Sequence, residues 1–333
     1  MIPALVLTAG LATRLRPLSL VRAKAAMPVA GEALVRRILR RLHAAGVRDA
    51  VLNLHYLPHT ITREVGDGAD LGMRVRYSWE MPVLGSAGGP RQALPLLDGP
   101  TFLIVNGDTL TDVDVTALVD EHRRTRALVT MAVVPNREPE KYGGVLVDNG
   151  GAVTGFSRRA STDPSHHFVG VQVADAAGFA SVAPGAVAES FTALYPELIR
   201  ARPGSVRAFV TDASFLDIGS PDDYLQTTLR LARGDRSRLR GVRTQIAPTA
   251  RVVDSVLWDD VAVGAGASLL GCVVTDGVRV PDGTSWTGMM VRCADGPLAA
   301  GEQRVGDLAI AAIRNSQHAT PNSQDPTSNA QNT

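Results

Sequence analysis

Cysteine is scarce in this chain of 333 residues, and so is net charge. The two cysteines, Cys272 and Cys293, lack zinc-type spacing, so we interpret them as small apolar residues in a reducing compartment. A formal net charge of +1 creates no strong field that would draw the chain to nucleic acid or to an anionic membrane. The composition, 45% hydrophobic and 20% charged, predicts a globular chain of about two domains.

Long apolar runs are missing as well. No run approaches the roughly 20 residues that a membrane-spanning helix needs. The first residues, 1–7, lack the basic region of a secretory signal and lead directly into a glycine turn. We therefore expect a cytoplasmic protein with neither a membrane nor a nucleic-acid partner.

Strands and helices alternate in the first part of the chain. Short apolar runs predict strands at 4–7, 50–54, 101–105 and 128–134. Apolar residues at helical spacing predict helices at 32–45 and 113–125. This alternation favours an α/β domain over residues 1–235 with a mainly parallel, Rossmann-like sheet. Ligands bind at the carboxyl ends of strands in such sheets, and two polar turns lie at these ends.

The pattern changes after about residue 240. Over residues 241–295, small or β-branched residues recur at intervals near six, which resembles the hexapeptide repeats of a left-handed parallel β-helix. A small β-domain with regular turns stays an alternative. We expect this domain to mediate self-association into a dimer or larger homo-oligomer. Residues 315–333 contain almost no apolar side chains and predict a disordered tail.

The loop after the first predicted strand reads Gly10-Leu11-Ala12-Thr13-Arg14-Leu15-Arg16-Pro17-Leu18. Small residues let backbone N–H groups approach an anion closely, and the guanidinium groups of Arg14 and Arg16 suit phosphate oxygens. Lys24 follows ten residues after Arg14, shortly before Met-Pro-Val. A glycine turn alone occurs in many α/β proteins, whereas this combination is far more specific.

The segment resembles the signature G-x-G-T-R-L-x-P-L-T…P-K-P-M-x-P-V of nucleoside-diphosphate-sugar pyrophosphorylases, the sugar-1-phosphate nucleotidylyltransferases. Ala12 stands for the second glycine, and Ala23 and Ala25 stand for the prolines around Lys24. The resemblance implies the nucleotidyltransferase fold, an Arg14 that stabilises the leaving pyrophosphate, and a Lys24 that contacts the phosphates. It also implies a loop that wraps the triphosphate, formed by Thr8, Ala9, Gly10, Leu11, Ala12 and Thr13.

Two aspartates match the family's metal ligands. Asp108 ends the segment Val105-Asn106-Gly107-Asp108 and matches V-x-x-G-D, although an aspartate after a strand can also cap the next helix. Asp217 lies in Phe215-Leu216-Asp217-Ile218-Gly219-Ser220-Pro221, which resembles W-x-D-I-G-T-P. The resemblance implies Mg²⁺ on Asp108 and Asp217, and two carboxylates suit this ion, which completes its shell with phosphates and water.

A third segment, residues 80–89, resembles E-x-x-x-L-G-T-A-G. Its small residues would let a base lie against the backbone, and this version is typical of mannose-1-phosphate guanylyltransferases, so guanine is favoured. The alternative is a glycine-rich turn before a helix near 91–97. The predicted base-binding residues are Glu80, Gly85, Ser86, Ala87 and Gly88.

The acceptor motifs depart from the family. The family's F-x-E-K-P corresponds to Phe156-Ser157-Arg158-Arg159-Ala160, where Arg159 can replace the lysine as a phosphate clamp. Arg158 cannot replace the glutamate, because a guanidinium only donates hydrogen bonds. The family's N-A-G-I-Y corresponds to 168–172, which lacks the asparagine. We interpret His166 and His167, just before it, as exposed loop residues. The predicted substrate-binding residues are Asn106, Tyr142, Gly143, Gly144, Arg158, Arg159, Phe168 and Gly170.

These motifs predict a Mg²⁺-dependent enzyme that joins an NTP, with GTP favoured, to a sugar 1-phosphate or a sugar-like cyclitol 1-phosphate and releases pyrophosphate. Its catalytic residues would be Arg14, Lys24 and Asp108. A modified acceptor is favoured because two missing polar contacts would leave hexose hydroxyls unpaired. The main alternative is a catalytically silent, nucleotide-sugar-binding regulatory subunit of the same fold. An acyltransferase is disfavoured because residues 241–295 contain no histidine.

Overall fold

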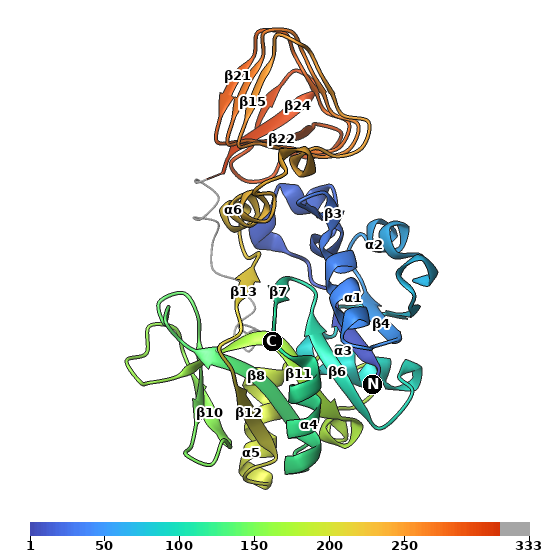
Figure 1. The fold of residues 1–333 in the computed structure, drawn as a ribbon, viewed down its shortest axis with the longest axis vertical. Coiled ribbons are helices and arrows are strands. Elements are labelled where there is room, and N and C mark those ends of the chain that lie inside the picture. The colour runs from blue at the N-terminus through green and yellow to red at the C-terminus, as the bar shows by residue number, and fades with distance from the viewer. Residues whose placement is uncertain (314–333) are drawn as a thin grey trace, which may run out of the picture. The chain divides into compact units, whose positions relative to one another are not determined.

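The computed structural model describes residues 1–313, which form two compact units (Figure 1). The first comprises residues 1–11 and 22–218, and the second comprises 12–21 and the described residues from 219 onward. The signature loop therefore changes unit between Leu11 and Ala12. The expected domain limits at 235 and 241–295 stay predictions, and the expected tail at 315–333 lies outside the described residues.

A nine-stranded mixed sheet is the centre of the first unit. Its main path runs β10-β9-β11-β6-β1-β4-β5, with β8 beside β11 and β12 beside β8. The strands β6, β1, β4 and β5 are mutually parallel, whereas β11 is antiparallel to β6 and to β8. The strands are β1 (Ala4–Leu7), β4 (Asp49–Leu54), β5 (Arg74–Trp79), β6 (Thr101–Asn106), β8 (Val129–Pro135), β9 (Gly144–Val147), β10 (Val153–Ser157), β11 (His166–Asp175) and β12 (Val206–Val210).

Helices pack on this sheet as their apolar spacing requires. The buried stripe of α1 consists of Leu34, Val35, Ile38, Leu39 and Leu42, which recur at helical intervals. The unit contains α1 (Leu34–Ala44), α2 (Pro58–Val65), α3 (Gly85–Ala93), α4 (Val115–Thr125) and α5 (Tyr195–Ala201). Because α3 begins at Gly85, a glycine-rich turn ahead of a helix near 91–97 is the wrong description of this segment.

Two short ribbons complete the first unit. β7 (Thr109–Thr111) pairs antiparallel with β13 (Phe215–Asp217), and β2 (Pro28–Val29) pairs with β3 (Glu32–Ala33). The first ribbon joins segments about a hundred residues apart in the chain, and it bears directly on the site.

A three-sided β-helix dominates the second unit (Figure 1). Equivalent strands of successive coils pair in parallel with an offset of 17 residues, for example Gln245 with Ala262 and Ala262 with Arg279. The sides are β14 (Gln245–Ile246), β17 (Ala262–Val263) and β20 (Arg279–Val280); β15 (Arg251–Val253), β18 (Ser268–Leu270) and β21 (Ser285–Thr287); and β16 (Val256–Leu257), β19 (Val273–Val274) and β22 (Met289–Cys293). The last side continues antiparallel through β24 (Leu308–Ala312) and β23 (Gln303–Val305). The expected β-helix is confirmed, and its handedness stays a prediction.

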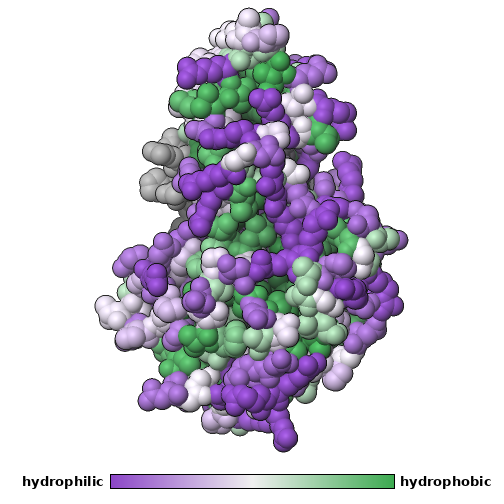
Figure 2. Space-filling view, in the orientation of Figure 1, coloured by the Kyte–Doolittle hydropathy of each residue, from purple (hydrophilic) through white to green (hydrophobic). Residues whose placement is uncertain are grey.

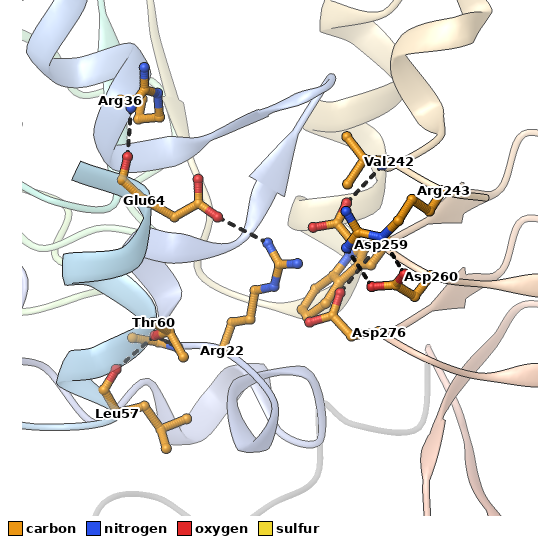
Figure 3. A network of polar contacts seen from close by, with 12 residues as sticks. Arg22, Arg36, Leu57, Thr60, Glu64, Val242, Arg243, Asp259, Asp260 and Asp276 are labelled. Atoms are coloured by element: carbon orange, nitrogen blue, oxygen red, sulfur yellow. Dashed lines mark hydrogen bonds and ion pairs between the residues drawn. The ribbon is translucent and has the colours of Figure 1, made fainter. Parts of the chain in front are cut away.

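The same offset repeats at the corners of the β-helix. The carboxylate of Asp259 accepts from the N–H of Val242, and that of Asp276 accepts from the N–H of Asp259 (Figure 3). Arg243 binds both oxygens of Asp260 at this corner. Aspartates in one coil thus satisfy corner N–H groups of the coil before it, which explains their regular recurrence in the sequence.

The second unit also contains α6 (Pro221–Leu231), capped by Ser220, and two single-turn helices from the signature loop, η1 (Thr13–Leu15) and η2 (Leu18–Leu20). The indole N–H of the fully buried Trp258 donates to the hydroxyl of Tyr224 in α6, at 2.8 Å. This bond fastens α6 to the β-helix.

The surface in Figure 2 is largely hydrophilic, with hydrophobic residues showing between polar ones. Within residues 1–313, no helix combines the length and apolar character that would let it cross a membrane.

Candidate active site

The carboxyl ends of four parallel strands bring the predicted site segments to one edge of the sheet. β6 leads to Asp108, β1 to the loop at Thr8, β4 to His55, and β5 to Glu80. Parallel neighbours end on the same side, so these segments lie beside one another in the order of the strands.

Lys24 and Asp108 form the centre of this edge. The Nζ atom of Lys24 donates to Oδ2 of Asp108 at 2.7 Å, and both side chains are partly exposed. Lys24 opens the short helix η3 (Lys24–Ala26), in which Ala25 and Ala26 are buried. An ammonium held on a carboxylate at a strand end provides both signs of charge for a bound phosphate and its counterion.

Packing and hydrogen bonds hold Lys24 where the family has prolines. The N–H of the buried Ala23 donates to Oγ1 of Thr60 at 3.1 Å. Arg22 contacts Glu64 at 3.4 Å, and the carbonyl oxygen of Glu64 accepts from Arg36 at 2.6 Å (Figure 3). These contacts with α2 restrain the segment around Lys24, which lacks the prolines of the family.

Asp217 reaches the same edge through the ribbon of β7 and β13. It pairs with Thr109, the neighbour of Asp108, and the N–H of Ile218 donates to the carbonyl oxygen of Asp108 at 3.3 Å. Within residues 1–313, no three His, Cys, Asp or Glu side chains group as metal ligands. An ion that takes one or two carboxylates and completes its shell with phosphates and water needs no more protein ligands than the two predicted aspartates.

The loop after β1 splits into anchored and available N–H groups. Thr8 and Ala9 donate their N–H groups to Oδ1 of Asn53, at 2.6 and 3.3 Å. Over the described part of the chain, the N–H groups of Gly10 and Leu11 donate to no protein acceptor. The N–H groups of Thr8 and Ala9 are thus held within the protein, and those of Gly10 and Leu11 are left available.

The remaining signature residues lie in the second unit. Ala12 adopts the left-handed conformation, with φ 49°, at the position where the family has glycine. Ser19 donates to the carbonyl oxygen of Ala12 at 2.9 Å and stabilises this turn. Thr13 and Arg14 begin η1, and the Arg14 side chain is exposed.

Glu80 is buried, with 4% of its surface exposed. Its Oε1 accepts from Nδ2 of Asn53 and its Oε2 from the N–H of Leu84, both at 2.8 Å. The carboxylate thus joins the end of β4 to the residue that precedes α3. These contacts give Glu80 an internal partner on each oxygen.

The glycine-rich segment packs against residues 186–190. The N–H groups of Ala87 and Gly88 both donate to the carbonyl oxygen of Ala188. Ser86 donates from Oγ to Glu189 at 2.6 Å. A Cβ on Gly88 would lie 2.2 Å from the carbonyl oxygen of Ala186, so this glycine permits the close approach. The N–H of Ser86 also donates to Glu189, at 3.3 Å, so three backbone N–H groups of the predicted base-binding segment are engaged within the chain.

Three aromatic rings from distant segments lie together in the region predicted to bind the acceptor. The ring of His167 lies 4.0 Å from that of Tyr142 and 4.7 Å from that of Phe215, centroid to centroid. Burial, with the nearby charge of Lys141, lowers the pKa of His167 to about 4. Burial raises the pKa of Tyr142, and the charge of Asp217 contributes to this shift. His166 and His167 belong to β11, so their interpretation as exposed loop residues is wrong.

Glycines allow close backbone approach here. Gly170, with φ 80°, lies where a Cβ would be 3.1 Å from Thr109 and 3.2 Å from Asn106. A Cβ on Gly144 would lie 2.3 Å from Oγ of Ser165, and Gly143 is exposed beside it. Phe168 packs on Phe191, with ring centroids 5.5 Å apart.

Arg158 and Arg159 follow β10 and are exposed. Over the described residues, neither guanidinium has a hydrogen-bond or ion-pair partner. The two arginines are therefore free to meet an anionic ligand.

Sequence reasoning missed Asn53 and His55. Nδ1 of His55 lies 2.9 Å from the carbonyl oxygen of Glu80. A polar residue inside the apolar run 50–54, at a strand end that faces the ligand edge, was the signal that could have found Asn53.

The family model described as nucleotidyl transferase matches residues 3–234. The chain belongs to this family, which confirms the resemblance to sugar-1-phosphate nucleotidylyltransferases. A mannose-1-phosphate guanylyltransferase of Mycobacterium tuberculosis is 30% identical over 294 residues, which span 85% of this chain and 82% of that protein.

Two other relatives place this similarity in context. An N-acetylmuramate alpha-1-phosphate uridylyltransferase of Neisseria meningitidis is 46% identical over 116 residues, 34% of this chain and 50% of that protein. The crystal structure of HddC from Yersinia pseudotuberculosis, complexed with GMP-PN, superposes with a TM-score of 0.61 at 22% identity. It covers 69% of this chain and 100% of that one, and at this identity it shows the fold alone.

Proposed function

We propose that the protein transfers a nucleotidyl group from an NTP, with GTP favoured, to a sugar 1-phosphate or a sugar-like cyclitol 1-phosphate, and releases pyrophosphate. The observation that carries this proposal is the Lys24–Asp108 pair at the strand ends, with Asp217 held beside it by the β7–β13 ribbon. Guanine is favoured because the Mycobacterium tuberculosis relative, which matches 85% of this chain, is named a mannose-1-phosphate guanylyltransferase. The shorter match to a uridylyltransferase makes UTP the second base to test.

The triphosphate would lie along the loop after β1. Among the residues that the structure describes, the N–H groups of Gly10 and Leu11 meet no protein acceptor, and they would bind phosphate oxygens. Lys24 would neutralise phosphate charge. The contacts of Ala12, Thr13 and Arg14 with the triphosphate and the departing pyrophosphate stay predictions.

The reaction needs positioning more than acid–base chemistry. The attacking oxygen belongs to a phosphate monoester whose second pKa is about 6, so it is already ionised at neutral pH. It attacks the α-phosphorus of the NTP, the bond to the β-phosphate oxygen breaks, and the electron pair leaves with pyrophosphate. The protein's part is to align two anions and offset their repulsion.

Asp108 and Asp217 would hold Mg²⁺. The ion, when bound, would neutralise charge shared between the two phosphates and polarise the α-phosphate. Lys24 would keep the Asp108 carboxylate oriented through Oδ2 and would compensate its charge before the ligands arrive.

The acceptor would lie between the aromatic rings and the exposed arginines. Arg159 would hold its phosphate, and Tyr142, Gly143, Gly144 and Gly170 would contact its ring. The absence of a carboxylate at Arg158 is the reason for favouring a modified acceptor over mannose or glucose 1-phosphate. The roles of Asn106 and Phe168 in acceptor binding, self-association through the β-helix and a cytoplasmic location stay predictions.

A matrix of five NTPs against sugar and cyclitol 1-phosphates, with Mg²⁺ and pyrophosphate release as the readout, tests this proposal. We expect one base and a narrow set of acceptors to support turnover. Rapid turnover of mannose 1-phosphate with a low KM would overturn the modified-acceptor part. If the protein binds nucleotide sugars but releases no pyrophosphate with any pair of NTP and acceptor, the regulatory subunit would be favoured. The lost acceptor contacts support this alternative.

A further inference from the structure

Asn53 occupies a central place that none of the sequence motifs assigns. It lies near the end of β4, between β1 and β5, and is 3% exposed. Its Oδ1 holds the N–H groups of Thr8 and Ala9, and its Nδ2 donates to Glu80. Through Oε2, Glu80 holds the N–H of Leu84, directly before α3.

Building on the proposed function, we propose that Asn53 and Glu80 form a buried relay that positions both ends of the nucleotide site. One end is the phosphate loop, whose next N–H groups, those of Gly10 and Leu11, are available to a ligand. The other end is the start of α3, the segment predicted to bind the base. Asn53 and Glu80 are positioning residues, since each acts on a ligand through the backbone that it holds.

The chemistry of the two ends dictates the chemistry of the relay. Backbone N–H groups donate at both ends, so an acceptor must meet each of them. Between those two acceptors, one further hydrogen bond needs a single donor. One amide and one carboxylate meet this requirement, two carboxylates oppose each other, and two amides leave a surplus donor. This requirement also fixes which atom of the Asn53 amide is the oxygen.

Burial makes the relay sensitive to any substitution that leaves one of its polar atoms unpaired. All four polar side-chain atoms lie in a buried setting, where an unpaired group is costly. Gly89 in α3 borders the relay closely: a Cβ there would lie 2.6 Å from Oε1 of Glu80 and 3.0 Å from Nδ2 of Asn53. A methyl group at this helical position would therefore push the carboxylate away without removing any hydrogen-bonding group.

The donor requirement yields a test by exchange. Asn53→Asp places two carboxylates together, and Glu80→Gln places two amides together. The double variant Asn53→Asp, Glu80→Gln restores one amide and one carboxylate in the opposite order, with volume and net charge unchanged. We expect each single variant to raise the KM for the NTP by about 10- to 100-fold, the cost of a buried unpaired group.

The double variant should return this KM to within about threefold of the parent value, while the KM for the acceptor stays unchanged in all three proteins. Gly89→Ala should raise the NTP KM like the single variants. Thr130→Val is the matched control, because it removes the buried Thr130 hydroxyl from His122 at 2.9 Å, far from the strand ends of the site. It should lower the melting temperature and leave both KM values unchanged.

The outcomes separate the relay from the proposed function. Parent protein that releases no pyrophosphate with any substrate pair overturns the proposed function, and the relay's nucleotide role with it. Active parent protein with unchanged NTP KM in the single variants overturns the relay alone. If the single variants do not fold, Gly89→Ala and the double variant decide: a raised NTP KM in the first and a parental one in the second support the relay, and any other combination overturns it.

Discussion

The nucleotide side and the acceptor side of the candidate site present different chemical groups to their ligands. On the nucleotide side, buried polar side chains hold the backbone, as Asn53 and Glu80 do, and the available groups are main-chain N–H donors. On the predicted acceptor side, aromatic rings from β11, β13 and the turn at Tyr142 meet, and the two arginines that follow β10 are exposed. One side depends on hydrogen bonds that must all be satisfied, and the other on side-chain shape and charge.

We expect this difference to decide which substitutions each side tolerates, although the phosphate loop and the lysine segment also depart from the family, at Ala12, Ala23 and Ala25. A backbone site tolerates few substitutions, because each internal hydrogen bond has one partner of the correct sign. A side-chain surface can be changed one residue at a time, as Arg158 illustrates. We infer that the nucleotide side determines which reaction is catalysed, and that the acceptor side determines which acceptor is used.

The largest effect is expected at Asp108, where the two sides meet. Asp108→Asn keeps the shape but removes the charge that pairs with Lys24 and would bind Mg²⁺. We expect kcat to fall by about 100- to 1,000-fold, the scale typical of losing one key charge-stabilising group. The half-saturating Mg²⁺ concentration should rise as well. Steady-state assays over a Mg²⁺ titration check both, and near-normal turnover would remove Asp108 from the metal site.

A gain of function should come next in size. Arg158→Glu restores the carboxylate that the family uses to accept from sugar hydroxyls, on an exposed residue whose replacement costs little stability. We expect kcat/KM for mannose 1-phosphate to rise by about tenfold, the scale of one regained hydrogen bond to a charged group. The KM for the NTP should not change, and Arg158→Gln should gain less. A fall in kcat/KM for mannose 1-phosphate would place Arg158 outside the acceptor site.

A smaller and one-sided effect is expected at His167. His167→Ala removes a ring that lies against the rings of Tyr142 and Phe215. Phe215 is two residues before Asp217 in the chain. One lost aromatic contact with the acceptor costs about 0.5–1.5 kcal/mol, so the acceptor KM should rise by roughly three- to tenfold. His167→Phe should retain most of the affinity. An equal rise in the NTP KM would contradict the division between the two sides.

Secondary structure can be predicted from the sequence where it depends on local patterns. β1 and α1 were predicted to within two residues, because a buried parallel strand and an amphipathic helix have distinct apolar patterns. Asp108 and Asp217 were paired only through the family resemblance. Their physical link is the β7–β13 ribbon, which joins segments a hundred residues apart and leaves no local pattern.

Long-range contacts explain what the sequence could not show. The N–H groups of Ala87 and Gly88 looked available for a base, but the carbonyl oxygen of Ala188 holds them from a distant segment. The sequence analysis interprets His167 as an exposed loop residue, yet it belongs to β11, which pairs with β8. In both cases the partner lies far along the chain, so propensity and spacing carry no information about it.

The smallest effect concerns acid stability and tests the buried character of the acceptor side. His167 titrates near pH 4 in the fold and near 6.5 in an unfolded chain, so the unfolded state binds more protons between these values. The free energy of unfolding should therefore decrease as the pH falls from about 6.5 to about 4. His167→Phe keeps a ring but has no group that binds a proton. Over this pH window, the free energy of unfolding of the variant should decrease less steeply than that of the parent, by the slope that corresponds to about one proton. Urea unfolding at half-unit pH steps measures the slope, and parallel curves for the two proteins would mean that His167 is solvated like any surface histidine.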